Sequence, residues 1–130
     1  MSLTTPTLSK VIRAALDRRL ADMRVSLPAT VVSFDSATQL ARVRPDLFEV
    51  AETESGDNQS YQLPDIVNVP VVVPGSGDGF LSFPVSAGDK CLLLFTDRSI
   101  DNWIRGVDGE PNDERRHDLS DAIAIVGLRN

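Results

Sequence analysis

The feature that most constrains this chain is a change in hydrophobic spacing at Pro28. Before Pro28, apolar residues recur every three or four positions, and after it they alternate with polar residues. The first pattern is typical of a helix with one apolar face, and the second is typical of strands with one apolar face. We therefore expect an amphipathic helix within residues 1–26 and a β domain over residues 27–130.

The predicted helix covers residues 7–24. Thr5 followed by Pro6 is a start signal, because a capping hydroxyl precedes a proline in the first turn. The apolar face of this helix consists of Leu8, Val11, Ile12, Ala15, Leu16, Leu20 and Met23. Such a face must be covered, either by the barrel of the same chain or by a partner, and the sequence leaves both alternatives open.

Short apolar segments separated by turn signals follow the helix, which favours a mainly β fold built as a small antiparallel barrel of five to six strands. A short helix is expected over residues 100–105, after the fifth strand, and residues 51–60 are expected to form a solvated loop. The expected strands are residues 29–34, 39–44, 65–73, 80–85, 90–96 and 122–128.

The third of these strands carries Val67, Val69, Val71 and Val73 on one face by simple alternation. Pro70 falls on the opposite face. Because proline cannot donate a backbone hydrogen bond, it predicts a sheet edge or a bulge at this point.

Two strands have more apolar residues than one barrel core can use. In the strand over 90–96, Leu92 and Leu94 make the second face apolar, and in the strand over 122–128 Ile123 and Ile125 do the same. These surplus faces predict cover by the first helix, by another subunit, or by both. The candidate interface residues are Leu8, Ile12, Leu16, Leu92, Leu94, Ile123 and Ile125.

Catalytic and metal-binding patterns are not found in the sequence. The single histidine, His117, has Ser120 and Asp121 nearby in sequence, but neighbours along a strand point to alternate faces. His117 is therefore interpreted as a loop residue with an ordinary hydrogen bond. The single cysteine, Cys91, is expected to be a buried thiol. We therefore expect no enzymatic activity, no cofactor and no bound metal.

The net charge of −6 disfavours nucleic acid as a partner, because an acidic chain repels phosphate. The arginines are interpreted as solvated or ion-paired, most of the phenylalanines as core residues, and Trp103 as a plug at the barrel end. A barrel that binds single-stranded nucleic acid nevertheless remains the alternative function, because small barrels of this kind can bind it on aromatic side chains.

The order of several segments resembles the N-terminal domain of the membrane-puncturing central spike proteins of contractile-tail phage baseplates. The resemblance covers nearly the whole chain and is carried by the spacing of its pieces rather than by any single one. These pieces are Ala29–Phe34, Ala41–Pro45, Leu63–Ile66 with Val69–Val71, Gly88–Phe95, and Arg115–Ala122.

This resemblance implies a barrel of the oligonucleotide/oligosaccharide-binding (OB) type, used as a scaffold in a virion protein of the tail baseplate. It implies a homotrimer that docks a C-terminal β-helical needle to the baseplate hub protein and reaches the host outer membrane through that needle. The protein would be made in the host cytoplasm. An iron ion at the needle tip is expected only in longer members, because no β-helical repeat and no tip histidine pair follow Leu128. We therefore expect either a shortened chain or a short relative that relies on another protein for its point.

Overall fold

The computed structural model describes residues 7–52, 56–107, 109–111 and 113–130. Its first element is the helix α1 (Leu8–Asp22). The hydroxyl of Thr7 caps this helix by accepting a hydrogen bond from the Lys10 amide at 3.3 Å. The predicted cap at Thr5 and Pro6 lies outside the described residues. The helix ends at Met23, whose backbone is extended, and the predicted helix is therefore confirmed with slightly shorter bounds.

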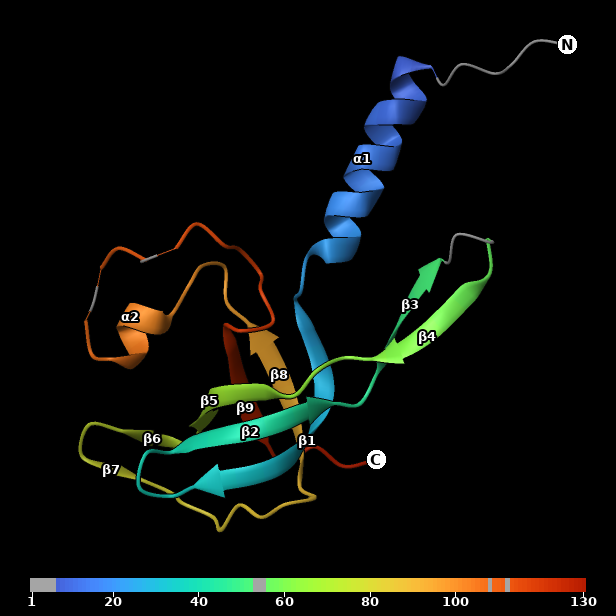
Figure 1. The fold of residues 1–130 in the computed structure, drawn as a ribbon. Helices are drawn as coiled ribbons and strands as arrows, with labels where there is room; N and C mark the ends of the chain where they lie inside the picture. The colour runs from blue at the N-terminus through green and yellow to red at the C-terminus, as the bar shows by residue number, and fades with distance from the viewer. Residues whose placement is uncertain (1–6, 53–55, 108, 112) are drawn as a thin grey trace, which may run out of the picture.

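Five strands form a closed barrel in the order β1-β2-β5-β9-β8 (Figure 1). Their bounds are Ser26–Asp35 for β1, Leu40–Pro45 for β2, Ile66–Val72 for β5, Lys90–Phe95 for β8 and Ala122–Val126 for β9. Four neighbouring pairs are antiparallel, whereas β5 and β9 run parallel. The mainly β barrel fold is confirmed, and the all-antiparallel arrangement is corrected at that one pair.

The parallel pair follows from the number of strands. In a closed ring of five strands the direction cannot alternate at every pair, so at least one pair must be parallel, and here it is β5–β9. The short helix α2 (Asp101–Ile104) lies in the connection between β8 and β9, which confirms the predicted helix after the strand over 90–96.

The core of the barrel is filled by alternate residues of its strands. Small side chains such as Ala29, Ala41 and Ala124 lie beside larger ones such as Val31 and Leu93, which lets a narrow barrel close without voids. Cys91 is fully buried in this core, as the sequence predicted.

The strand β5 breaks the simple alternation predicted for it. Ile66 and Val69 both face the core, and Val67 is exposed, so the prediction that Val67 shares a face with Val69 is wrong. The reason is Asn68, whose φ of 56° is left-handed and adds a residue against the partner strand, where Ala41 pairs with Val69 and Val43 with Ile66. The predicted bulge near Pro70 is thus confirmed, but β5 is paired on both sides and is not an edge.

Two hairpins lie outside the barrel (Figure 1). One is formed by β3 (Phe48–Glu52) and β4 (Asn58–Gln62), in a region where the sequence predicted only a loop over 51–60. The other is formed by β6 (Gly75–Ser76) and β7 (Gly79–Phe80). Residues 81–86 have no regular structure, so the predicted strand over 80–85 is wrong. The barrel closes through β9 instead, which leaves no place for that segment in the sheet.

No helix among the described residues is both long enough and apolar enough to cross a bilayer.

Candidate assembly surface

An apolar feature on the outside of the barrel lies on β8 and β9. Side chains alternate along both strands, so that every second one faces away from the core. The pairing places Leu92 opposite Ile125 and Leu94 opposite Ile123. These four residues, here called the outer strip, therefore form two adjacent cross-strand pairs. Leu94 and Ile125 remain 40% and 39% exposed, and Leu92 and Ile123 are half-buried.

The outer strip has a paired strand on each side. On one side Pro28 of β1 pairs with Leu92, and on the other side the exposed Val72 of β5 pairs with Ile125. Both neighbours extend the apolar surface across four strands. Because all backbone edges here are paired, a partner would cover this surface by side-chain packing rather than by strand addition.

The other three predicted interface residues lie on α1. Leu8, Ile12 and Leu16 follow one another at four-residue spacing and are all exposed. No residue of α1 is buried, and the helix extends away from the barrel (Figure 1). The structure thus brings together four of the seven candidates and leaves the other three on a separate, uncovered element.

The segment between α1 and β1 is fixed to the barrel. The Arg24 amide donates to the carbonyl of His117 at 3.1 Å, and Nδ1 of His117 lies 2.9 Å from the carbonyl oxygen of Arg24. The Phe95 amide donates to the Val25 carbonyl at 3.0 Å, and the Arg24 guanidinium forms an ion pair with Glu49 of β3. These contacts set the direction in which α1 leaves the barrel.

An ion cluster around Arg115 holds the long connection between β8 and β9. Its guanidinium donates two hydrogen bonds of 2.8 Å to the carboxylate of Asp121, which is completely buried. It also pairs with Asp101 of α2 at 2.8 Å and with Asp113 at 3.3 Å. The hydrogen bonds that Arg115 donates to Asp121, and then those to Asp101, raise the pKa of Arg115 above its ordinary value. The sequence placed Arg115 and Asp121 in one motif but did not reveal this cluster.

The turn before β9 is organised by Asp118. Its carboxylate accepts hydrogen bonds from the Ser120 amide at 3.0 Å and from the Ser120 hydroxyl at 2.7 Å. These two donors lower the pKa of Asp118, so the carboxylate stays charged and the turn stays closed over the physiological pH range. The closing segment of the chain is therefore positioned by local hydrogen bonds as well as by Arg115.

Two arginines that could have formed a basic patch on the barrel share one carboxylate partner. Arg44 and Arg42 of β2 each donate to Asp65 at 3.1 Å. The hydrogen bond from Arg44, followed by that from Arg42, lowers the pKa of Asp65 and keeps it charged as their common partner. The interpretation of these arginines as ion-paired is confirmed.

The aromatic residues are placed differently from the prediction. Phe95 is buried and Phe34 packs against the core, but Phe48, Phe80 and Phe83 are exposed. Trp103 is 55% exposed and does not plug the barrel. The reason is that Phe48 and Phe80 lie on the two hairpins outside the barrel and Phe83 on the irregular segment, so none of the three faces the core.

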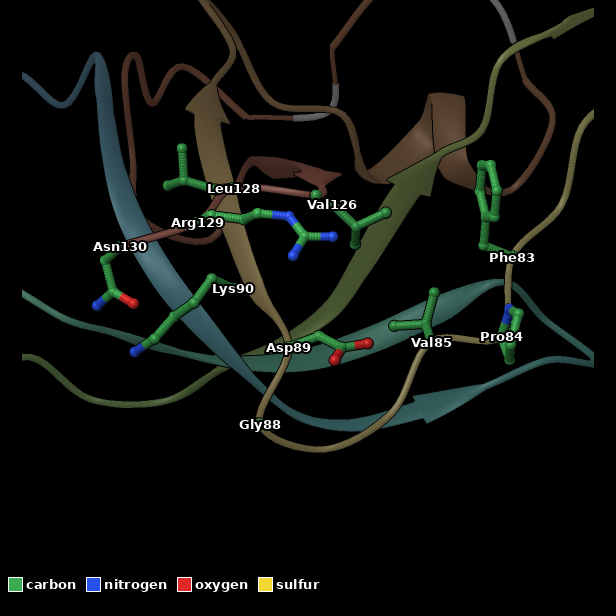
Figure 2. A pocket seen from close by; sticks show the side chains of 11 residues that line it. Phe83, Pro84, Val85, Gly88, Asp89, Lys90, Val126, Leu128, Arg129 and Asn130 are labelled. Atoms are coloured by element: carbon green, nitrogen blue, oxygen red, sulfur yellow. The ribbon is translucent and has the colours of Figure 1, made fainter.

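A hollow of about 650 Å³ lies at the end of the barrel where β8 begins. Figure 2 shows Phe83, Pro84 and Val85 along one side and the last residues of the chain along another, with Asp89 and Lys90 between them. Nζ of Lys90 already binds the Thr30 hydroxyl at 2.7 Å and the Asp46 carboxylate at 3.2 Å. Of the two basic residues that line the hollow, Lys90 and Arg129, Lys90 is thus already bound by the barrel itself.

The side chains that could act as a nucleophile or a base, Cys91 and His117, are respectively buried and hydrogen-bonded. Burial raises the pKa of the Cys91 thiol to about 11, so it is not a nucleophile at neutral pH. Both ring nitrogens of His117 have partners, the Arg24 carbonyl on one side and Asp97 at 3.0 Å on the other, as expected of a loop histidine. Within the described ranges, no group of three or more His, Cys, Asp or Glu side chains is placed to hold a metal ion.

Comparison with known proteins bears on the barrel alone. Residues 27–127 match the family model described as phage protein Gp138 N-terminal domain. The matched range begins in β1 and ends just after β9, so it contains every barrel strand and leaves α1 outside. No curated protein matches the chain.

Proposed function

This chain belongs to the phage protein Gp138 N-terminal domain family, and from that premise we propose that it is the barrel domain of a baseplate central spike. Membership indicates a structural protein of a phage virion and points to a non-enzymatic role. The finer proposal is that three copies assemble about the tail axis, in the tail baseplate. The assembled domain would dock a needle to the hub protein, and the needle would meet the host outer membrane.

The observation that carries this proposal is the outer strip. A closed five-stranded barrel satisfies its own core, yet Leu92, Leu94, Ile123 and Ile125 form a second apolar layer on its outside. Apolar side chains gathered in this way on a closed sheet are typical of a surface that another protein covers. A scaffold that forms a symmetric ring needs such a surface on every copy.

The barrel also suits a part that transmits force. Its five strands leave no free edge in the closed sheet. The hydrogen bonds between Arg115 and Asp121 fix the long connection between β8 and β9 to the barrel. A stiff domain of this kind would pass the thrust of tail contraction from the hub to the needle without changing shape. No bound cofactor is needed for this role.

The test is the absolute mass of the purified chain, measured by size-exclusion chromatography with light scattering at several concentrations. We expect a trimer that persists on dilution to the low micromolar range, a range typical of stable interfaces. Leu94→Glu and Ile125→Glu should each shift the mass toward the monomer, because a charge in an apolar contact is costly. Ser33→Glu, at an exposed position of β1, is the matched control and should stay trimeric. A wild-type chain that is monomeric at all concentrations would contradict the proposal.

A further inference from the structure

We propose that α1 of one copy covers the outer strip of a neighbouring copy, so that the subunits are linked by exchanged helices. This inference rests on the proposed function, because it assumes that the chain assembles. It addresses two features that the barrel fold leaves open: an uncovered apolar helix and an uncovered apolar strip in the same chain. The helix lies outside the range that matches the family, so the family does not account for it.

The first step is that α1 cannot cover the outer strip of its own chain. The helix is joined to β1 by only three residues, Met23 to Val25. Met23 is extended, with φ of −78° and ψ of 119°, and the two that follow are hydrogen-bonded to His117 and Phe95. A return of α1 over β8 would need a reverse turn in this segment and would break those hydrogen bonds. The geometry therefore directs α1 away from its own barrel.

The second step is that α1 is poorly suited to pack against copies of itself. At 100° per residue, Arg19 falls between Ile12 and Ala15 in the middle of the apolar face. In a symmetric bundle of these helices, the Arg19 side chains would meet at the centre. Like charges brought together in a buried seam are unfavourable, so a homotypic bundle is disfavoured. Against the outer strip each Arg19 stands alone, and its long side chain can lie along the apolar surface with the guanidinium in water.

The third step is charge complementarity between the helix and the barrel. Residues 8–22 contain four basic and two acidic residues, a net charge of +2. Residues 26–130 contain eight basic and seventeen acidic residues, a net charge of −9. Just beyond the outer strip, Asp97 follows the end of β8 with its side chain 79% exposed. A basic helix with an apolar face thus fits an acidic barrel with an apolar strip.

The fourth step concerns symmetry. The helix and the strip are different surfaces, so contact between them is head-to-tail and each copy both gives and receives one helix. Head-to-tail contacts form a ring when the rotation between copies closes, and three copies would close a ring about the tail axis. In this arrangement no uncovered strip and no uncovered helix would remain.

The experiment is disulfide trapping between two differently substituted chains, one carrying Ile12→Cys on α1 and the other Leu94→Cys on the outer strip. Because each chain has one introduced cysteine and Cys91 is buried, a 12–94 disulfide can form only between copies. After the chains are refolded together and oxidised, we expect about tenfold more 12–94 product than 12–12 product, because docking raises the local concentration of the pair. The products are identified by mass spectrometry of peptides.

Lys10→Cys, on the opposite side of α1 from Ile12, is the matched control and should give little product with Leu94→Cys. A trimer whose main product is 12–12, or which gives no 12–94 product, would overturn the helix exchange and leave the spike proposal standing. A monomeric wild-type chain would instead contradict the spike proposal itself. A chain carrying both cysteines that closes the 12–94 disulfide within a monomer would also overturn the exchange.

Discussion

At the scale of single residues, Asp121 shows how one buried charge fixes a large part of this fold. Its carboxylate is completely buried and accepts hydrogen bonds from the Arg115 guanidinium and from the Ile100 amide at 3.2 Å. Its own backbone carbonyl accepts from the Thr96 amide at 2.9 Å. One residue therefore connects the end of β8, the start of α2 and the start of β9. A buried carboxylate is tolerated here because the paired arginine and the Ile100 amide compensate for the loss of water.

We predict that Asp121→Asn lowers the free energy of unfolding by about 3 kcal/mol, because it removes one charge of a buried pair and leaves Arg115 without its bidentate partner. Asp113→Asn, which alters an exposed partner of the same arginine, should lower it by less than about 1 kcal/mol. Urea denaturation followed by circular dichroism measures both variants. An equal loss of unfolding free energy in the two variants would show that the stabilising effect of the Arg115–Asp121 pair does not depend on the burial of Asp121.

At the scale of elements, two irregularities shape the barrel. In β1 the register shifts between Val31 and Ser33, and in β2–β5 it shifts between Ala41 and Val43. Each shift adds a residue to one strand, which bends it and increases its twist, and such bends help a short sheet close on itself. Asn68 makes the second shift possible, because asparagine adopts left-handed backbone angles more readily than most residues.

We predict that Asn68→Val destabilises the barrel by about 1–2 kcal/mol, because a β-branched side chain is strained at a φ of 56°. Asn68→Gly should leave stability within about 1 kcal/mol of the wild type, since glycine adopts this conformation without strain. Val67→Ile, at the exposed neighbouring position, is the control and should change little. Thermal unfolding of the three variants compares them, and a valine variant as stable as the glycine variant would argue against the strained position.

At the scale of the whole molecule, charge and exposed apolar surface indicate the kind of partner. Several aromatic side chains are exposed, as a barrel that stacks bases would require, but they lie on separate elements: the β3–β4 hairpin, β7 with the segment that follows it, and α2. The net charge of −6 and the pairing of Arg42 and Arg44 with Asp65 work against phosphate binding. Both features favour a protein partner over a nucleic acid.

We therefore predict no binding of a fluorescein-labelled single-stranded oligonucleotide of mixed sequence to the chain, even at low salt. Fluorescence anisotropy at two ionic strengths is the measurement, because phosphate binding strengthens steeply as salt falls. A single-stranded-DNA-binding protein with an OB fold is the positive control. Anisotropy that rises with protein concentration at low salt and falls on adding salt would support the nucleic-acid alternative instead.

The sequence by itself determined the elements whose patterns are local. The helix at residues 8–22 follows from three- and four-residue spacing, the β1–β2 hairpin from alternation on both sides of a turn, and the strands β8 and β9 from alternation alone. It also identified Leu92, Leu94, Ile123 and Ile125 as surplus, because a strand with two apolar faces has one face too many for a single core. Their opposition in two pairs then followed from the antiparallel register of neighbouring strands.

Only the tertiary structure decided which segments enter the barrel and which side chains stay uncovered. Residues 80–85 alternate like a strand but lie outside the sheet, because β9 occupies the place beside β5. The same alternation put Val67 on the wrong face, since one left-handed residue reverses every position before it. Likewise, the apolar face of α1 was plain in the sequence, but its direction is set by the contacts of Arg24 and Val25 with residues far along the chain. Local patterns determine which secondary structure a segment can form. Closure of the sheet and long-range hydrogen bonds determine whether the segment joins the barrel and which of its side chains are covered.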